Sequence, residues 1–533
     1  MPRISGLALL FVTVGLMGCS QEARLPDLKQ IYQKASSVDD RVGSQRRPLV
    51  AIPGTLGSRL VDSASGKIIW GGSGSRGISA DPEDPEEYAL IALPIAKADE
   101  PFADLVDTVV PGGILETAEA EILGVPISIN VYGDALGVLS DGGFRVQRGI
   151  RRFQAGGDPD AVLDDVPEAA RLPNPVEPAV EVTDFDTFQF DYDWRRDLID
   201  SAHKFGHFLE KRRRDVARTQ NKPEGSVKFD LLAHSMGTLV SRYFLMYGFA
   251  DPAPGEPLPP ITWAGADYFS RVVFVAPPNS GSVIALDNLI NGKELGPLQP
   301  VFPPALLGTH VSPYQLMPRV RHRRVMRDGA PVIDLYDVDF WEEMGWGLLN
   351  PAAEAELALM MPDEPSPERR RSRARAYTKR LLARSETFHK MMDRWTPPPE
   401  HLDLFLVVGG GFETPATAEI DPVGTFRITG LEEGDGVVLR ASALADERQD
   451  GNSSTGFRSP LRYKTTLFLP DEHVELTRNR VFGDNLLFWL LEAPRGGSEL
   501  ARPNKTGFLG NVSDGPTQAA DTEGGFLPGN DDR

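Results

Sequence analysis

The chain has 533 residues, 41% of them hydrophobic, which is enough for a large core in about three or four domains or in one enlarged domain with insertions. Its formal net charge of −20 at pH 7 argues against a nucleic-acid partner, because phosphate contacts need a clustered basic surface. The single cysteine excludes an intramolecular disulfide, while the oligomeric state stays open.

The first 19 residues are predicted to be a targeting signal. Arg3 precedes an apolar run over residues 4–17, which is shorter than the roughly 20 residues of a membrane-spanning helix. The run leads to Gly18-Cys19 and resembles a bacterial lipoprotein signal with its lipobox. This resemblance implies a lipid on Cys19 and, with Ser20 next, a place in the cell envelope at the outer membrane, facing the periplasm or the outside. An ordinary secretory signal, or a short membrane anchor with a stray cysteine, is the alternative.

A polar, charged tether over residues 20–47 is expected to precede the folded body. Residues 49–52, LVAI, then predict a buried strand, which stops at the turn residues Pro53 and Gly54. Gly54 permits a close approach of the backbone, so the next residue, Thr55, is a candidate backbone donor, although an ordinary Pro-Gly turn explains the same residues. Residues 71–125 are rich in Gly, Pro and Asp and indicate a lid-like insertion.

The most informative segment is residues 229–237, FDLLAHSMG. An apolar run that ends in A-H-S-M-G predicts a strand turning sharply into a helix, with the hydroxyl of Ser235 exposed at the turn. Ala233 and Gly237 are small enough for such a turn, although Ala233 departs from the usual glycine. Apolar residues at helical spacing follow Ser235, so a strand, a turn and a helix are all predicted here.

Further buried strands are predicted at residues 187–190, 271–276, 402–408 and 465–469, and an amphipathic helix at 198–216. Strands that alternate with amphipathic helices favour an α/β fold with a mostly parallel sheet covered on both faces. The expected boundaries are a signal at 1–19, a tether at 20–47, the two parts of the core at 48–282 and 400–492, a cap insertion at 283–399 and a disordered tail at 493–533.

The cap contains an arginine-rich helix over residues 369–384. A solvated helix face explains these arginines most simply, and binding of anionic lipid headgroups is the alternative.

A serine nucleophile needs a histidine base and an acid that orients the base. In hydrolases of this topology the chain order is serine, acid, histidine. His473 follows the last predicted strand and is therefore the favoured base. The other histidines after Ser235 lie in the cap or at the start of a strand: His310, His322, His389 and His401.

Asp435 is the favoured acid because it lies between Gly434 and Gly436, in a loop after a strand and before His473. Asp421, in a turn, and Asp403, inside a strand, are the alternatives. The oxyanion of an acyl-transfer reaction needs two backbone donors, for which Met236, directly after the nucleophile, and Thr55 are the candidates.

No metal and no cofactor are expected. His203 and His207 are four residues apart on the predicted helix, but the sequence offers no third ligand at suitable spacing. They are interpreted as surface and groove residues of that helix.

Six segments in order along residues 48–492 together resemble the lecithin:cholesterol acyltransferase family, which includes lysosomal phospholipase A2 and phospholipid:diacylglycerol acyltransferase. The most specific segment is the tetrad Tyr192-Asp193-Trp194-Arg195, which generic esterases lack. The other five are residues 53–60 (PGTLGSRL), 233–237 (AHSMG), 276–282 (APPNSGS), 434–438 (GDGVV) and the region from His473. Val437 departs from the usual Thr, and the disulfide-bounded lid of eukaryotic members cannot form.

The resemblance implies an α/β-hydrolase fold, a triad of Ser235, Asp435 and His473, and an oxyanion donor at Thr55. It further implies a lipid substrate and transfer of a fatty acyl group from a phospholipid to an alcohol or to water. A plain lipase or esterase that uses only water is the first alternative. An envelope lipoprotein that has kept the fold without catalysis is the second.

Overall fold

The computed structural model describes residues 47–72, 79–95, 100–122, 125–146, 186–294, 301–332, 334–394, 396–446, 459 and 461–493, with only the backbone at 118–122 and 125–130. The predicted signal with Cys19, nearly all of the predicted tether and all but the first residue of the predicted tail therefore lie outside the described residues. Within the described ranges, no helix combines the length and apolar character that a membrane crossing requires.

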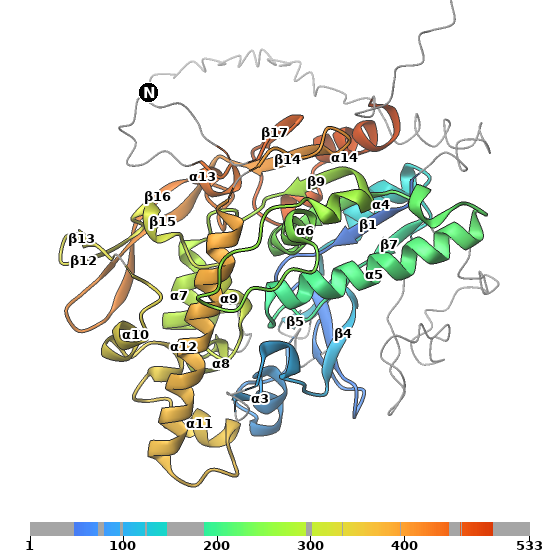
Figure 1. Cartoon of the computed structure of the whole chain (residues 1–533). Coiled ribbons are helices and arrows are strands. Elements are labelled where there is room, and N and C mark those ends of the chain that lie inside the picture. Colours follow the sequence, from blue (N-terminus) through green and yellow to red (C-terminus); the bar gives the residue numbers. More distant parts are fainter. Residues whose placement is uncertain are drawn as a thin grey trace, which may run out of the picture.

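A six-stranded sheet forms the centre of the molecule, and all of its neighbouring strands run parallel. In spatial order its strands are β17 (Thr465–Leu469), β14 (Asp403–Gly409), β9 (Phe269–Val275), β8 (Phe229–His234), β1 (Leu49–Ile52) and β7 (Thr187–Gln189). Helices cover both faces of the sheet (Figure 1). The predicted fold class, α/β with a mostly parallel central sheet, is confirmed.

Alternate side chains of the strands enter two separate cores, as the period-two geometry of a strand requires. Val50 and Ile52 of β1 pack toward α5 (Leu198–Thr219) and α6 (Met236–Tyr247), while Leu49 and Ala51 pack toward α4 (Gly133–Asp141) and α14 (Arg480–Leu487). Apolar burial on both faces fixes the strand register, because a shift of one residue would exchange the two faces.

The segment predicted as a lid-like insertion contains regular structure. Its strands are β2 (Ser58–Asp62), β3 (Ile68–Trp70) and β4 (Val109–Ile114), which form one antiparallel sheet, and β5 (Thr117–Ile122) and β6 (Val125–Asn130), which form a hairpin. Its helices are α3 (Pro85–Ile91) and η2 (Phe102–Asp104). Asp84 caps α3 by accepting hydrogen bonds from two backbone N–H groups of the first turn.

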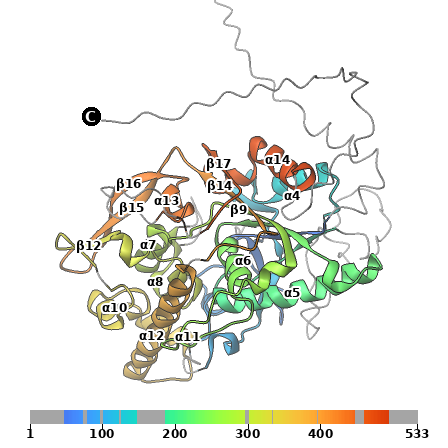
Figure 2. The same ribbon diagram turned by 45° about the horizontal axis from the view of Figure 1, so that its top comes forward.

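The predicted cap lies between β9 and β14 and is mostly helical. Its helices gather on one side of the central sheet in both views (Figures 1 and 2). They are α7 (Val283–Asn291), α8 (Pro304–Leu307), α9 (Ser312–Gln315), η7 (Val320–His322), α10 (Val338–Met344), η8 (Gly347–Leu349), α11 (Glu354–Met360) and α12 (Pro367–Met392). The short strands are β10 (Lys293–Glu294), β11 (Val301–Phe302), β12 (Val325–Arg327) and β13 (Ala330–Pro331).

The segment predicted as the second part of the core also contributes to the cap side. β15 (Phe412–Ile420) and β16 (Phe426–Gly434) form a hairpin that joins β12 and β13 in a separate four-stranded sheet. The remaining short elements are α13 (Arg440–Ala443), the turns η5 (Glu224–Ser226), η6 (Ala264–Tyr268) and η9 (Glu475–Thr477), and η10 (Phe488–Glu492).

Several arginines of the arginine-rich helix α12 form ion pairs within the cap. Arg370 pairs with Glu354, and Arg375 pairs with both Asp339 and Glu342. These pairs tie α12 to its neighbours α10 and α11, so part of its basic face already has protein partners.

Candidate active site

Ser235 lies at the sharp turn between β8 and α6. Its backbone has φ 52° and ψ −127°, a conformation that L-residues rarely adopt. Gly237 makes the turn possible, because a Cβ there would lie 2.3 Å from the carbonyl oxygen of Pro53. Gly54 is equally constrained, since its Cβ would lie 2.7 Å from the Cβ of Ser235. Both glycines therefore let the first loop lie directly against the serine.

Ser235, His473 and Asp435 form a continuous chain of hydrogen bonds. The Ser235 hydroxyl lies 2.8 Å from Nε2 of His473, and Nδ1 of His473 lies 2.8 Å from Oδ2 of Asp435. A carboxylate only accepts, so Nδ1 carries the hydrogen and Nε2 is left to accept the serine proton. The arrangement has the form of a nucleophile, a base and an orienting acid.

Asp435 reaches this place by a detour of the chain. The chain leaves the central sheet at Gly409, forms the hairpin of β15 and β16, and returns so that Asp435 lies against the end of β14. A Cβ on Gly409 would lie 2.5 Å from the Cβ of Asp435, which shows how closely the two segments pack. The glycine next to Asp435, Gly436, has a φ of 87°, which suits glycine and not other residues.

The ionised form of Asp435 is stabilised despite its burial. Burial by itself disfavours the charged carboxylate, but the charge and hydrogen bond of His473 and the backbone N–H groups of Val438 and Val437 together lower the pKa of Asp435 below its usual value. The two N–H groups donate to Oδ1 at 2.7 Å and 3.0 Å. Oδ2 is thereby left to orient His473.

A second buried histidine, His234, supports the first. Its Nε2 lies 3.0 Å from the carbonyl oxygen of His473, so Nε2 carries the hydrogen. Its Nδ1 then accepts from the Tyr132 hydroxyl at 2.8 Å, and that hydroxyl in turn accepts from the N–H of Gly54 at 2.8 Å. Burial, with the nearby His473, lowers the pKa of His234 to about 3, so its imidazole stays neutral.

This chain of contacts from Gly54 through Tyr132 and His234 to His473 was missed in the sequence. His234 lies inside the segment that identified Ser235, but its role depends on a contact with a residue 239 positions later. Tyr132 lies in no motif, so no signal in the sequence could have found it.

The two candidate oxyanion donors lie on adjacent elements. Met236 is the first residue of α6, and its sulfur lies 3.2 Å from the Thr55 hydroxyl. The backbone N–H groups of Thr55 and Met236 have no acceptor within the described part of the chain, as expected of a loop and of the first turn of a helix. The N–H of Gly54 is already bonded to Tyr132, which leaves Thr55 as the favoured donor of this loop.

The tetrad Tyr192-Asp193-Trp194-Arg195 also contacts the same loop. The Tyr192 hydroxyl donates to the carbonyl oxygen of Pro53, and the Trp194 indole donates to that of Ser58. Arg195 is fully buried, and its guanidinium donates to Asp193, to Asp107 and to the carbonyl oxygens at the end of α3. The tetrad therefore joins the first loop to the insertion.

The segment at 276–282 braces the loop that carries Asp435. The Asn279 amide donates to the carbonyl oxygen of Ala443, and the Ser282 hydroxyl donates to that of Val437, each at 2.8 Å. Ser442 returns a hydrogen bond to Gly281. The 276–282 segment follows β9 of the central sheet, whereas the acid loop follows β16 of the separate four-stranded sheet, so these contacts fix the acid relative to the central sheet.

The alternative candidates lie elsewhere in the structure. Asp421 accepts hydrogen bonds from Val423 and Thr425 within its turn, and Asp403 at the start of β14 pairs with Lys464. The histidines of the cap and of the strand start have backbone partners or lie away from Ser235. His310 bonds to Ile91, His389 to Gln315 and His401 to Ala266, and His322 belongs to η7.

The sequence model described as lecithin:cholesterol acyltransferase matches residues 184–317. The predicted resemblance is confirmed. The matched segment includes the Tyr192–Arg195 tetrad, Ser235 and the brace at 276–282, whereas Thr55, Asp435 and His473 lie outside it. This family match supports a lipid acyltransferase or a phospholipase-like hydrolase.

Among solved structures, the chain is similar to one described as the Tle4-Tli4 complex. The match has a TM-score of 0.48 and 14% sequence identity, and it covers 84% of this chain and 98% of that chain. A search of curated proteins finds no significant match.

Proposed function

We propose that the protein is a serine-dependent lipid acyltransferase or phospholipase that forms an acyl-enzyme on Ser235. The observation that carries this proposal is the hydrogen-bonded chain from Ser235 through His473 to Asp435, with 2.8 Å at both steps. The lecithin:cholesterol acyltransferase match over residues 184–317 supports a lipid ester as the substrate class.

In the proposed reaction, Nε2 of His473 takes the proton of Ser235 as the serine oxygen attacks the ester carbonyl carbon. The backbone N–H groups of Thr55 and Met236 stabilise the resulting oxyanion. The tetrahedral intermediate collapses, the ester bond breaks, and the leaving alkoxide takes the proton from His473 and departs as the lyso-product. Water or an alcohol then attacks the acyl-serine by the same route, and Ser235 regains its proton.

Apolar residues at the site also favour a lipid substrate. Val437, in the acid loop, and Val474, directly after the base, are 39% and 38% exposed. An exposed apolar side chain close in sequence to the acid and another next to the base offer contact area to an acyl chain.

Labelling with a fluorophosphonate probe tests the nucleophile. The wild-type protein should be labelled, whereas Ser235→Ala should not, and Ser226→Ala serves as a control because Ser226 is an exposed serine of η5 whose hydroxyl donates to Pro223. Equal labelling of Ser235→Ala and the wild type would refute Ser235 as the nucleophile. Absence of labelling in the folded wild type would favour the non-catalytic alternative.

Product analysis separates transfer from hydrolysis. The protein is incubated with phospholipid vesicles, with and without a sterol or another long-chain alcohol. A new ester that forms only with the alcohol present, and not with Ser235→Ala, supports transfer. Free fatty acid as the sole product would favour the plain lipase.

The proposal also includes a lipid anchor on Cys19 that holds the enzyme at the outer membrane. Mass spectrometry of the N-terminal peptide should find Cys19 modified by lipid, and Cys19→Ser should release the protein from the membrane fraction. An unmodified Cys19 in the mature protein would refute the anchor.

A further inference from the structure

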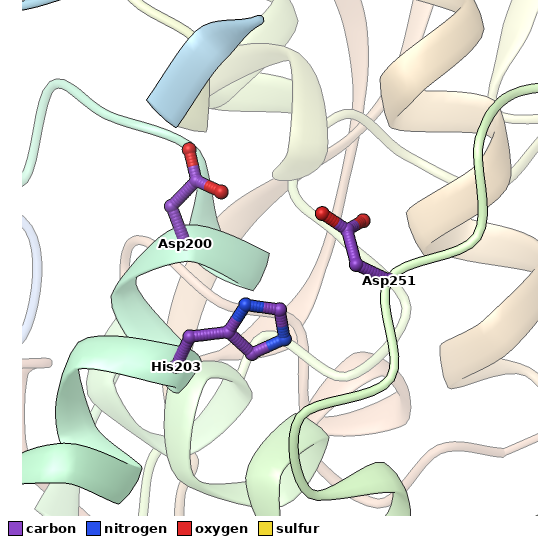
Figure 3. Close-up of side chains that lie close together, drawn as sticks. All are labelled: Asp200, His203 and Asp251. Atoms are coloured by element: carbon purple, nitrogen blue, oxygen red, sulfur yellow. The ribbon is translucent and has the colours of Figure 1, made fainter. Parts of the chain in front are cut away.

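A second polar cluster lies away from Ser235, where α5 faces the loop that follows α6. Asp200 and His203 are one turn apart on α5, and Asp251 comes from the loop. One ligand atom from each of the three side chains lies within 4.8 Å of the others. Figure 3 shows both carboxylates on the same side of the His203 ring. The sequence pattern paired His203 only with His207, so the fold supplies the partners that spacing along one helix could not.

Asp200 is the unusual member of the cluster. Its side chain is only 10% exposed, and no donor in the described part of the chain lies within hydrogen-bonding distance of its carboxylate. A cationic group that approaches it is the guanidinium of Arg384, at 3.9 Å. A buried carboxylate without a donor is costly, because it has lost its water without gaining hydrogen bonds.

Arg384 does not supply the missing hydrogen bond to Asp200, because its N–H groups donate to other carboxylates. Its guanidinium donates to Asp197 at 2.6 Å and to Asp251 at 2.5 Å. Only one oxygen of Asp251 accepts that bond, so the other oxygen is available to a further partner. The carboxylates of Asp197, Asp200 and Asp251 thus surround one guanidinium. The positive charge of Lys204 attracts the Asp200 carboxylate electrostatically but makes no hydrogen bond to it.

His203 is oriented as a ligand would be. Its Nε2 lies 3.3 Å from the carbonyl oxygen of Ala250, so Nε2 carries the hydrogen and Nδ1 presents a lone pair. Histidines that bind metals commonly donate their other N–H to a carbonyl or carboxylate in this way. A lone pair beside two carboxylates is a repulsive arrangement unless a cation or a proton lies between them.

The cluster is accessible from solvent. Asp200 and Asp251 line a surface cavity of about 470 Å³, together with Phe102, Arg380 and Arg384. Asp251 itself is exposed, so its side chain can shift to bring the ligand atoms closer. About 1 Å of closure suffices, because atoms bound to one zinc ion at 2.0 to 2.2 Å lie about 3.5 Å apart.

We propose that Asp200, His203 and Asp251 bind one divalent transition-metal ion, with zinc as the preferred species. One imidazole nitrogen and two carboxylate oxygens form a mixed donor set that suits zinc better than calcium or magnesium, which prefer oxygen ligands only. The ion balances the excess negative charge and links α5 to the loop after α6. This site does not depend on the reaction proposed for Ser235.

Titration calorimetry on the full chain, after removal of metals with EDTA, tests the proposal. ZnCl2 should bind with a stoichiometry of one and raise the unfolding temperature, whereas CaCl2 should bind at least about tenfold more weakly. Absence of zinc binding by the folded wild type would overturn the proposal. Equal affinity for calcium and zinc would overturn the assignment of a transition-metal site.

Variants identify the ligands. Asp200→Asn and His203→Gln should each weaken zinc binding by more than about tenfold, since even the loss of outer-shell partners typically costs 10- to 100-fold. His207→Gln is the matched control, because His207 lies on the same helix but is exposed and pairs with Glu210. Unchanged affinity in His203→Gln, or loss of binding in His207→Gln, contradicts the site.

Two further measurements keep the test independent of folding and of catalysis. Circular dichroism in EDTA establishes that each variant is folded, and X-ray absorption at the zinc edge should report nitrogen and oxygen ligands at about 2.0 to 2.2 Å. Sulfur in the first shell would overturn the assignment. Ser235→Ala should bind zinc with wild-type affinity, so failure of the proposed reaction and failure of the metal site are distinguishable.

Discussion

Two polar centres contact the loop at residues 53–58, and they differ in how completely their hydrogen bonds are satisfied. The tetrad centre surrounds Arg195, whose guanidinium makes five hydrogen bonds to carboxylate and carbonyl oxygens. The candidate active site contains Ser235 and His473, which share a single exchangeable proton across 2.8 Å.

The difference separates a structural centre from a chemical one. In the tetrad centre, charge pairing raises the pKa of Arg195 and lowers the pKa of Asp193, even though burial opposes both charges, so no proton is exchanged near neutral pH. In the candidate active site, the backbone N–H groups of Thr55 and Met236 have no acceptor within the described residues, which leaves them available to a reaction intermediate. The polar groups of the tetrad centre, whose hydrogen bonds are all made, fix its geometry. The unbonded N–H groups of the candidate active site can bind the oxyanion of the proposed reaction.

The largest expected effect is on turnover. Ser235→Ala should lower kcat for lipid ester cleavage by about 10⁶-fold, because the nucleophile is lost, while the unfolding temperature changes by only a few degrees. Steady-state kinetics with a chromogenic ester and a thermal scan measure both. A loss of less than about tenfold would assign the chemistry to another residue.

Asp435→Asn should lower kcat by about 10⁴-fold. The amide keeps the size of the carboxylate but donates toward Nδ1 of His473, which moves the hydrogen to Nε2 and removes the acceptor for the serine proton. Asp421→Asn is the matched control, since Asp421 only stabilises its own turn. Comparable activity in the two variants would contradict Asp435 as the orienting acid.

Arg195→Met should destabilise the fold by about 3 kcal/mol, because buried Asp193 loses its fully buried cation and, like the partly buried Asp107, keeps only Arg196. Arg375→Met, which also removes an arginine with two carboxylate partners but at an exposed position, should cost much less, because solvent screens exposed ion pairs. Urea denaturation measures both. Equal costs would remove the distinction between the buried centre and a surface ion pair.

Tyr132→Phe should cost about 1 to 3 kcal/mol, because Gly54 loses the acceptor of its buried N–H. It should also lower kcat with little change in KM, since the first loop and His473 both lose support. Tyr314→Phe controls for the loss of a buried hydroxyl, because the Tyr314 hydroxyl bonds to Gly308. If Tyr132→Phe lowers stability but leaves kcat unchanged, the contacts from Gly54 through Tyr132 to His473 do not position the reacting groups.

The last expected effect is on the pH dependence of stability and leaves the candidate active site unchanged. Burial, with the nearby charge of Arg195, lowers the pKa of His310 from 6.5 to about 3. Between these values the unfolded chain binds a proton at His310 that the folded chain does not, so the stability is complete above pH 6.5 and falls as the pH is lowered. The contribution is about 1.4 kcal/mol per pH unit.

His310→Gln should therefore give a shallower decline of stability between pH 6 and pH 4, which urea midpoints across that range can measure. Asp200, whose pKa is raised to about 7 by burial and by the charge of Asp197, acts in the opposite direction, so the comparison is made between variant and wild type at each pH. An unchanged slope would mean that His310 is protonated in the folded state.

Local patterns identified most of the central sheet. The strand predicted at residues 465–469 agrees with β17, and that predicted at 49–52 agrees with β1. Apolar runs of this kind can be recognised because a strand buried on both faces needs apolar residues at consecutive positions. The hairpin of β15 and β16 was not predicted, since its faces alternate between buried and exposed positions and its partner strands lie in the cap.

The sequence by itself determined the elbow at Ser235, the alternation of strands and helices, and the short set of acids and bases that could serve the serine. These features depend on neighbouring residues, through backbone sterics and apolar periodicity. Tertiary structure alone decided that Asp435 lies against the end of β14, that Tyr132 supports His234, and that Asp251 meets Asp200 and His203. Contacts of that kind depend on how distant segments pack, and local spacing carries no information about them.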